Sequence, residues 1–126
     1  MKSVISTKSA PAAIGPYSQA IKTGNLIFIS GQLPADPETG NLAGTTIREQ
    51  AQAALKNVKA VAEASGSSLE KIVKTTCFLK DMNDFPEFNE VYKTFFKTDC
   101  PARSTIGVLK LPKDALVEIE AIAELY

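Results

Sequence analysis

The segment LVEIEAIAEL, residues 116–125, alternates between apolar side chains and, at most of the positions between them, carboxylates. Successive side chains of a β-strand point to opposite faces of a sheet, so this alternation predicts a strand with one buried face. The side chains expected on the buried face are Val117, Ile119, Ala121, Ala123 and Leu125. The opposite face carries Glu118, Glu120 and Glu124, with Ile122 among them.

Three further segments predict strands. Residues 26–30, 72–79 and 104–109 are rich in the apolar and β-branched residues that strands favour. The first of them is apolar on both alternating faces, so both faces of the sheet are expected to be covered there.

Two segments predict helices. Residues 47–64 repeat apolar side chains at helical spacing, and Thr46 with Glu49 forms a capping box that predicts where this helix begins. Residues 85–97 predict a second helix with one aromatic-rich face, for which Asp84 is the expected N-cap.

The order of the predicted elements indicates the fold class. Strands, a helix, a strand, a second helix and two strands predict an α+β or α/β sheet, and we adopt an α+β fold with a mixed β-sheet as the prediction. Crossover connections are right-handed, so both helices are expected on one face of the sheet. Two helices leave the second face uncovered although it carries apolar side chains. Self-association through that face is the simplest way to cover it, and it would place sites at the seams between subunits.

Composition narrows the function classes. The chain has 126 residues, which predicts a single domain over residues 1–126, and its 14 basic and 14 acidic residues give no net charge. A balanced charge argues against binding to nucleic acid or anionic membranes. The chain has no histidine, which excludes Ser-His-Asp and Cys-His catalysis within one chain, and no cluster suited to a metal ion is visible. No apolar leader precedes the domain, so we expect a cytoplasmic protein, with Cys77 and Cys100 as free thiols.

Two residue types carry the candidate chemistry. The chain has only two arginines, and Arg103 lies in a Pro-Ala-Arg-Ser-Thr segment at the start of a predicted strand. Its planar fork could bind a carboxylate in two places or form an ordinary interface salt bridge. Glu118 and Glu120 share one strand face, where a partly dry carboxylate could act as a general base or pair with a neighbouring subunit. Spacing alone does not decide between these readings.

Several separated motifs resemble the RidA (reactive intermediate deaminase A, YjgF) family, and together they span most of the chain. They are residues 10–20, 30–32, 73–76, 89–92, 101–104, 111–112 and 117–123. The resemblance implies a chorismate-mutase-like fold that assembles as a trimeric barrel. It also implies a homotrimer with sites between subunits, which agrees with the uncovered sheet face.

The same resemblance implies an activity and a set of site residues. It implies a 2-iminobutanoate/2-iminopropanoate deaminase that hydrolyses enamine and imine intermediates, such as 2-aminoacrylate, to 2-keto acids and ammonia, with no cofactor or metal. Arg103 would hold the substrate carboxylate and Glu118 would activate water. The Gly31 backbone would hydrogen-bond the substrate, and Tyr17 and Asn89 would line the pocket. Thr105 stands where many deaminating members carry a cysteine.

Other functions stay open on the sequence. A non-catalytic trimeric protein could use the same pocket to bind or sense a small carboxylate. An endoribonuclease or translation inhibitor is disfavoured by the absence of histidine and of a basic surplus. A chaperone-like holdase activity could follow from exposed apolar surface after dissociation.

Overall fold

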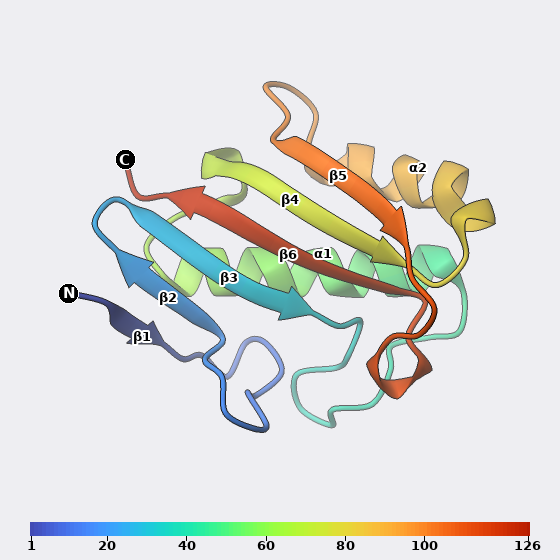
Figure 1. The fold of residues 1–126 in the computed structure, drawn as a ribbon, viewed down its shortest axis with the longest axis horizontal. Helices are drawn as coiled ribbons and strands as arrows, with labels where there is room; N and C mark the ends of the chain where they lie inside the picture. The colour runs from blue at the N-terminus through green and yellow to red at the C-terminus, as the bar shows by residue number, and fades with distance from the viewer.

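A computed structural model describes residues 1–126 and shows one six-stranded mixed sheet with two α-helices (Figure 1). The spatial order of the strands is β1-β2-β3-β6-β4-β5, and only the β4–β5 pair is parallel. The strands are β1 (Ser3–Ile5), β2 (Ala20–Thr23), β3 (Leu26–Gln32), β4 (Ile72–Leu79), β5 (Ala102–Gly107) and β6 (Val117–Glu124). The helices are α1 (Ile47–Ala64) and α2 (Phe85–Phe95).

Both helices cover the same face of the sheet, as predicted, and in Figure 1 they lie behind it. The core fills the space between sheet and helices, where 22 buried residues form one cluster. The predicted inward face of β6 is buried from Val117 to Ala123, whereas Glu120 on the other face is exposed. Neither helix is both long enough and apolar enough to cross a membrane.

Each predicted element lies within two residues of the observed one at both ends. The bounds of α1 and β4 match, and the Thr46–Glu49 capping box is present. The second helix ends at Phe95, two residues before the predicted end, and β5 begins at Ala102, two residues before the predicted start.

The predicted N-cap of α2 is wrong. Asp84 has helical backbone angles and its side chain makes no cap hydrogen bond, because a 3₁₀ turn over Met82–Asp84 leads directly into the helix. Asp81 caps that turn instead, accepting a hydrogen bond from the Asn83 backbone N–H. A short turn of this kind carries no periodicity that a sequence pattern could reveal.

The N-terminal hairpin was not predicted. Strands β1 and β2 have three and four residues, too few for a period-two pattern to stand out. A Gly24-Asn25 turn joins β2 to β3, and Gly24 has a φ of 57°, which favours glycine.

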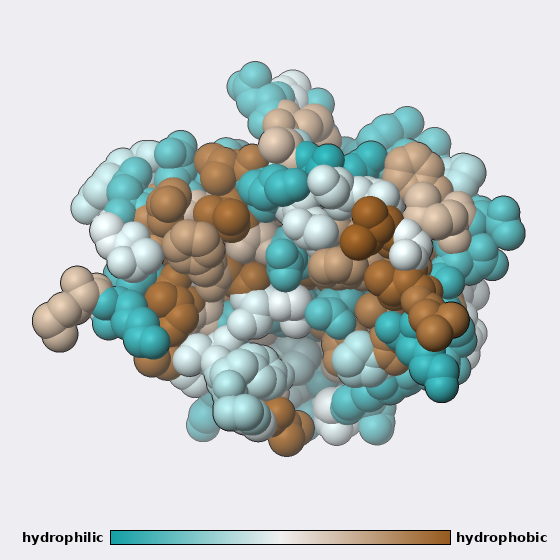
Figure 2. Space-filling view, in the orientation of Figure 1, coloured by the Kyte–Doolittle hydropathy of each residue, from teal (hydrophilic) through white to brown (hydrophobic).

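The uncovered face of the sheet exposes apolar side chains between polar ones. Leu26 and Phe28 of β3 are 38% and 43% exposed, and Ile106 of β5 is 46% exposed. Figure 2 views this face and shows brown apolar residues gathered over the sheet, interrupted by teal and white residues. Exposed apolar side chains on this scale are consistent with the predicted self-association.

Candidate active site

Arg103 lies on β5, the edge strand next to β4, and its side chain points to the helix-covered face. Its register partner on β4 is Thr75, which is buried beneath α2. The guanidinium carbon lies 4.6 Å from the centre of the Tyr92 ring and 5.4 Å from the centre of the Phe85 ring. Arg103 Nη1 donates a hydrogen bond of 2.9 Å to Asn89 Oδ1.

All three contacts of the guanidinium come from one stripe of α2. Phe85, Asn89 and Tyr92 are spaced i, i+4 and i+7, which places them on one side of a helix. We call these three residues the α2 stripe. Arg103 and Asn89, both predicted as site residues, therefore lie together. The structure adds two aromatic neighbours from the aromatic-rich face that was predicted for this helix.

The guanidinium has no acidic partner. Arg103 is half-buried, it takes part in no salt bridge, and its single side-chain hydrogen bond goes to the neutral amide of Asn89. Its Nε and Nη2 groups have no partner within the chain. A cation removed from water is costly unless a counter-charge joins it, so this arrangement suits an anion brought from outside.

Thr105 lies two residues further along β5, on the same side of the strand as Arg103. Its Oγ1 atom is buried and has no hydrogen-bond partner, the only such side-chain atom in the chain. Most buried polar groups in proteins are paired. The nearest polar side chain across the register is the Cys77 thiol, a weak hydrogen-bonding group.

The thiol of Cys77, opposite Thr105 on β4, lacks the features of a reactive cysteine. Cys77 pairs with Thr105 across the β4–β5 register and is completely buried. Burial raises the pKa of the Cys77 thiol to about 11, so the thiol is protonated at neutral pH. Both cysteines are free, as predicted.

The second group of predicted residues lies on the open face of the sheet. Tyr17, Gly31, Glu118 and Glu120 line one groove of about 820 Å³. A β-bulge in β3 between Ile29 and Gln32 lies beside β6 and carries Gly31.

Two sequence motifs meet at this groove. The Ser30 hydroxyl donates a 2.6 Å hydrogen bond to the Ser18 carbonyl, and the Ser30 N–H donates to the Gln19 carbonyl at 3.0 Å. The buried Gln19 side chain donates to the Ala10 and Pro11 carbonyls at 3.3 and 2.8 Å. These contacts hold the segment that carries Tyr17 against β3.

The position of the Glu118 side chain leaves no room for a side chain at Gly31. A Cβ atom at Gly31 would overlap Glu118 Oε2 and would lie 2.9 Å from the Glu118 carboxyl carbon. The Glu118 side chain thus packs directly on the Gly31 backbone, which only glycine permits without displacement.

The Glu118 carboxylate is half-buried and accepts no hydrogen bond from the chain. Burial, and secondarily the charge of Glu120, raises the pKa of Glu118 above its usual value. A carboxylate with a raised pKa is a better proton acceptor than an ordinary one, provided it is still ionised at the working pH.

Arg103 and Glu118 lie on opposite faces of the sheet in one chain. Arg103 aligns through Thr75 with Ala121 of β6, and Glu118 is an odd number of residues from Ala121. The groove around Glu118 accordingly lacks Arg103, Asn89 and Thr105. One chain brings the predicted residues together as two separate groups.

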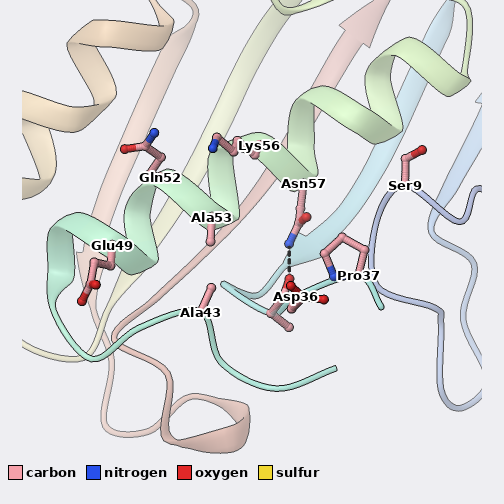
Figure 3. Close-up of a pocket in the computed structure, with 10 residues that line it drawn as sticks. Ser9, Asp36, Pro37, Ala43, Glu49, Gln52, Ala53, Lys56 and Asn57 are labelled. Atoms are coloured by element: carbon pink, nitrogen blue, oxygen red, sulfur yellow. Dashed lines mark hydrogen bonds between the residues drawn. The ribbon is translucent and has the colours of Figure 1, made fainter. Parts of the chain in front are cut away.

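A further hollow, of about 520 Å³, lies between α1 and the loop around Pro37 (Figure 3). Asn57 of α1 lines this hollow and links α1 to the loop by donating hydrogen bonds to the Leu33 and Ala35 carbonyls at 3.0 and 2.9 Å. None of the predicted site residues lines it.

The fold and these two groups define an α+β domain that carries a guanidinium without an acidic partner on one sheet face and a half-buried carboxylate on the other. The sequence profile of the Endoribonuclease L-PSP family matches residues 7–125, and the chain belongs to this family, also known as YjgF/RidA.

Individual relatives support the same placement. The chain is 54% identical to a "RutC family protein" of Pyrococcus horikoshii, over 98% of both chains. It is 50% identical to the "2-iminobutanoate/2-iminopropanoate deaminase" of Mus musculus, over 98% of this chain and 91% of that one. Among solved structures it resembles E. coli TdcF with bound serine, with a TM-score of 0.93, 46% identity and coverage of 97% and 98%. The family thus includes imine deaminases, and the predicted YjgF-like fold is confirmed.

Proposed function

We propose that this protein hydrolyses 2-imino acids, such as 2-iminopropanoate and 2-iminobutanoate, to 2-keto acids and ammonia. Enamines such as 2-aminoacrylate would enter as their imine tautomers. The observation that carries the proposal is Arg103, a half-buried guanidinium with no acidic partner, whose Nε and Nη2 nitrogens have no hydrogen-bond partner in the chain. A small carboxylate matches that fork.

Relatives support the class of substrate. The mouse relative is named for this reaction, and TdcF was solved with serine, a small amino acid whose carboxylate has the geometry that the Arg103 fork would bind. Thr105 lies two residues beyond Arg103 on the same side of β5 and is retained in the proposed site on the family resemblance.

The reaction needs water, a base and a fixed substrate. Glu118 accepts a proton from water as the water oxygen attacks the carbon of the protonated imine, which gives a neutral carbinolamine. Glu118 then returns this proton to the nitrogen and takes the proton of the carbinolamine hydroxyl as the C–N bond breaks, so that ammonia leaves and the keto group forms. The Gly31 backbone and Tyr17 border the carboxylate of Glu118 and would contact the substrate. Positioning and one general base supply the catalysis, with no cofactor or metal.

The complete site requires two subunits. Because Arg103 and Glu118 lie on opposite faces of the sheet, Arg103 of one subunit would meet Glu118 of a neighbour. The exposed apolar side chains of the open face provide the contact surface for a homotrimer with three such sites.

A coupled assay tests the proposal. An amino-acid oxidase generates imino acids in solution, and their decay is followed with wild-type and variant protein. Arg103→Ala should lower kcat/KM by roughly a hundredfold because it removes a charge-assisted bidentate contact. Glu118→Gln should lower kcat by about 10²- to 10⁴-fold.

Arg48→Ala is the matched control, since the other arginine of the chain is exposed and pairs with Glu87 at 3.3 Å. It should leave turnover unchanged. Equal imine decay with wild type and Arg103→Ala would reject the proposal. Binding of a small carboxylate without any turnover would favour the alternative of a non-catalytic binding protein.

A further inference from the structure

The guanidinium of Arg103 contacts three side chains of α2 before any carboxylate binds. Arginine has a long, flexible side chain, and a ligand that must order it loses affinity to the entropy of that ordering. In this chain the α2 stripe already orders it: Asn89 accepts from Nη1, and two aromatic rings flank the guanidinium.

Tyr92 is the closer of the two rings and is itself fixed at both ends. Its hydroxyl shares a hydrogen bond of 2.7 Å with Thr75 Oγ1, and both groups are buried. Its ring packs between Phe88 and Phe96, with ring centres 5.6 and 4.7 Å away. Burial raises the pKa of Tyr92 to about 12, so the phenol stays neutral and keeps this hydrogen bond at neutral pH.

Tyr92, Thr75 and Arg103 are linked to one another in pairs. Thr75, which bonds the Tyr92 hydroxyl, is also the register partner of Arg103 on the parallel β4–β5 pair. The backbone of β5 and the ring beneath the guanidinium are therefore tied to the same residue. These links restrain the distance between the Arg103 backbone on β5 and the Tyr92 ring against which its guanidinium packs.

We propose that Tyr92 is a positioning residue for Arg103, and that the α2 stripe directs the Nε–Nη2 edge of the guanidinium toward the substrate carboxylate. Asn89 occupies Nη1 and the rings flank the planar group, which leaves Nε and Nη2 as the edge without partners. The inference rests on the proposed function in that the anion is taken to be a substrate carboxylate.

Variants at Tyr92 separate the ring from the hydroxyl. Tyr92→Leu removes the ring beneath the guanidinium and should raise the Kd for 2-oxobutanoate, a stable product, and the KM for 2-iminobutanoate about tenfold, the size of a lost cation–π contact. Tyr92→Phe keeps the ring and loses only the bond to Thr75, so it should restore most of the affinity. Phe95→Leu, on the same helix without a contact to Arg103, is the control for general damage to α2.

A double-mutant cycle distinguishes positioning from a merely structural role. Arg103→Lys keeps the positive charge but lacks the planar fork, so Tyr92→Leu should change the Kd little in that background. An equal loss of affinity in both backgrounds, or a loss with Phe95→Leu as large as that with Tyr92→Leu, would overturn the inference.

The binding and turnover measurements separate the two proposals. Wild-type protein that binds 2-oxobutanoate in a Tyr92-dependent way without hydrolysing imines would support the positioning role and reject the deaminase. Normal hydrolysis with a Kd that Tyr92→Leu leaves unchanged would reject the positioning role alone.

Discussion

The α2–β5 region around Arg103 and the β3–β6 region around Glu118 differ in how many contacts the chain makes with the charged group. The guanidinium of Arg103 is held by three side chains of one helix and by the strand that carries it. The Glu118 carboxylate has no hydrogen-bond partner and lies in a wide groove against a glycine backbone. The proposed binding group is therefore prearranged within one chain, whereas the proposed base is partly desolvated and open to water.

The most demanding test asks whether the two regions work across a subunit boundary. Assemblies that contain both Arg103→Ala and Glu118→Gln chains should regain about a third of wild-type turnover, because one of the three sites in each mixed trimer has both native residues. Each variant alone should be almost inactive. Coexpression with two affinity tags isolates the mixed assemblies for assay, and mixtures as inactive as their parents would show that both residues act from the same chain.

A smaller effect is expected when the Glu118 region is crowded. Gly31→Ala adds a Cβ that overlaps Glu118 Oε2, so the carboxylate must move and kcat should fall by about tenfold while affinity for 2-oxobutanoate changes little. Gly24→Ala is the control: its Cβ meets nothing within 4 Å, although its positive φ strains the hairpin turn. If Gly31→Ala retains full kcat, the contact with Glu118 is not used in turnover.

The smallest effect concerns the charge beside the base. Glu118 must be ionised to accept a proton, and its raised pKa means that this form is lost as pH falls through a value above the usual one. Glu120→Gln removes the nearby negative charge, lowers the pKa of Glu118, and should move the acidic limb of the kcat profile to lower pH. Glu124→Gln, on the same strand and the same face, is the control. A limb that stays in place after Glu120→Gln would assign it to another group.

Local patterns in the sequence predicted much of the fold. The alternation over residues 116–125 and the helical spacing over 47–64 reflect burial along a single element, and both elements are present. The three- and four-residue strands β1 and β2 lack such a pattern, and Asp84 was misassigned because its conformation depends on the preceding 3₁₀ turn.

The arrangement of the candidate site depended on facts that local patterns do not contain. The spacing of Phe85, Asn89 and Tyr92 is visible in the sequence, but that they face Arg103 follows from the parallel register of β4 and β5. Whether Arg103 and Glu118 share a face depends likewise on pairing across β4. The family resemblance named Arg103, Asn89 and Glu118, but the helix-borne rings became apparent only from the three-dimensional packing.

The support of the guanidinium within a single chain has a consequence for dilute solutions. On the proposed assembly, dissociated subunits keep Arg103 against α2 but lose the neighbour's Glu118. Specific activity would then fall as the protein is diluted, because dissociation separates Arg103 from the neighbour's Glu118. Each separated subunit would keep the Arg103 group that binds the substrate carboxylate.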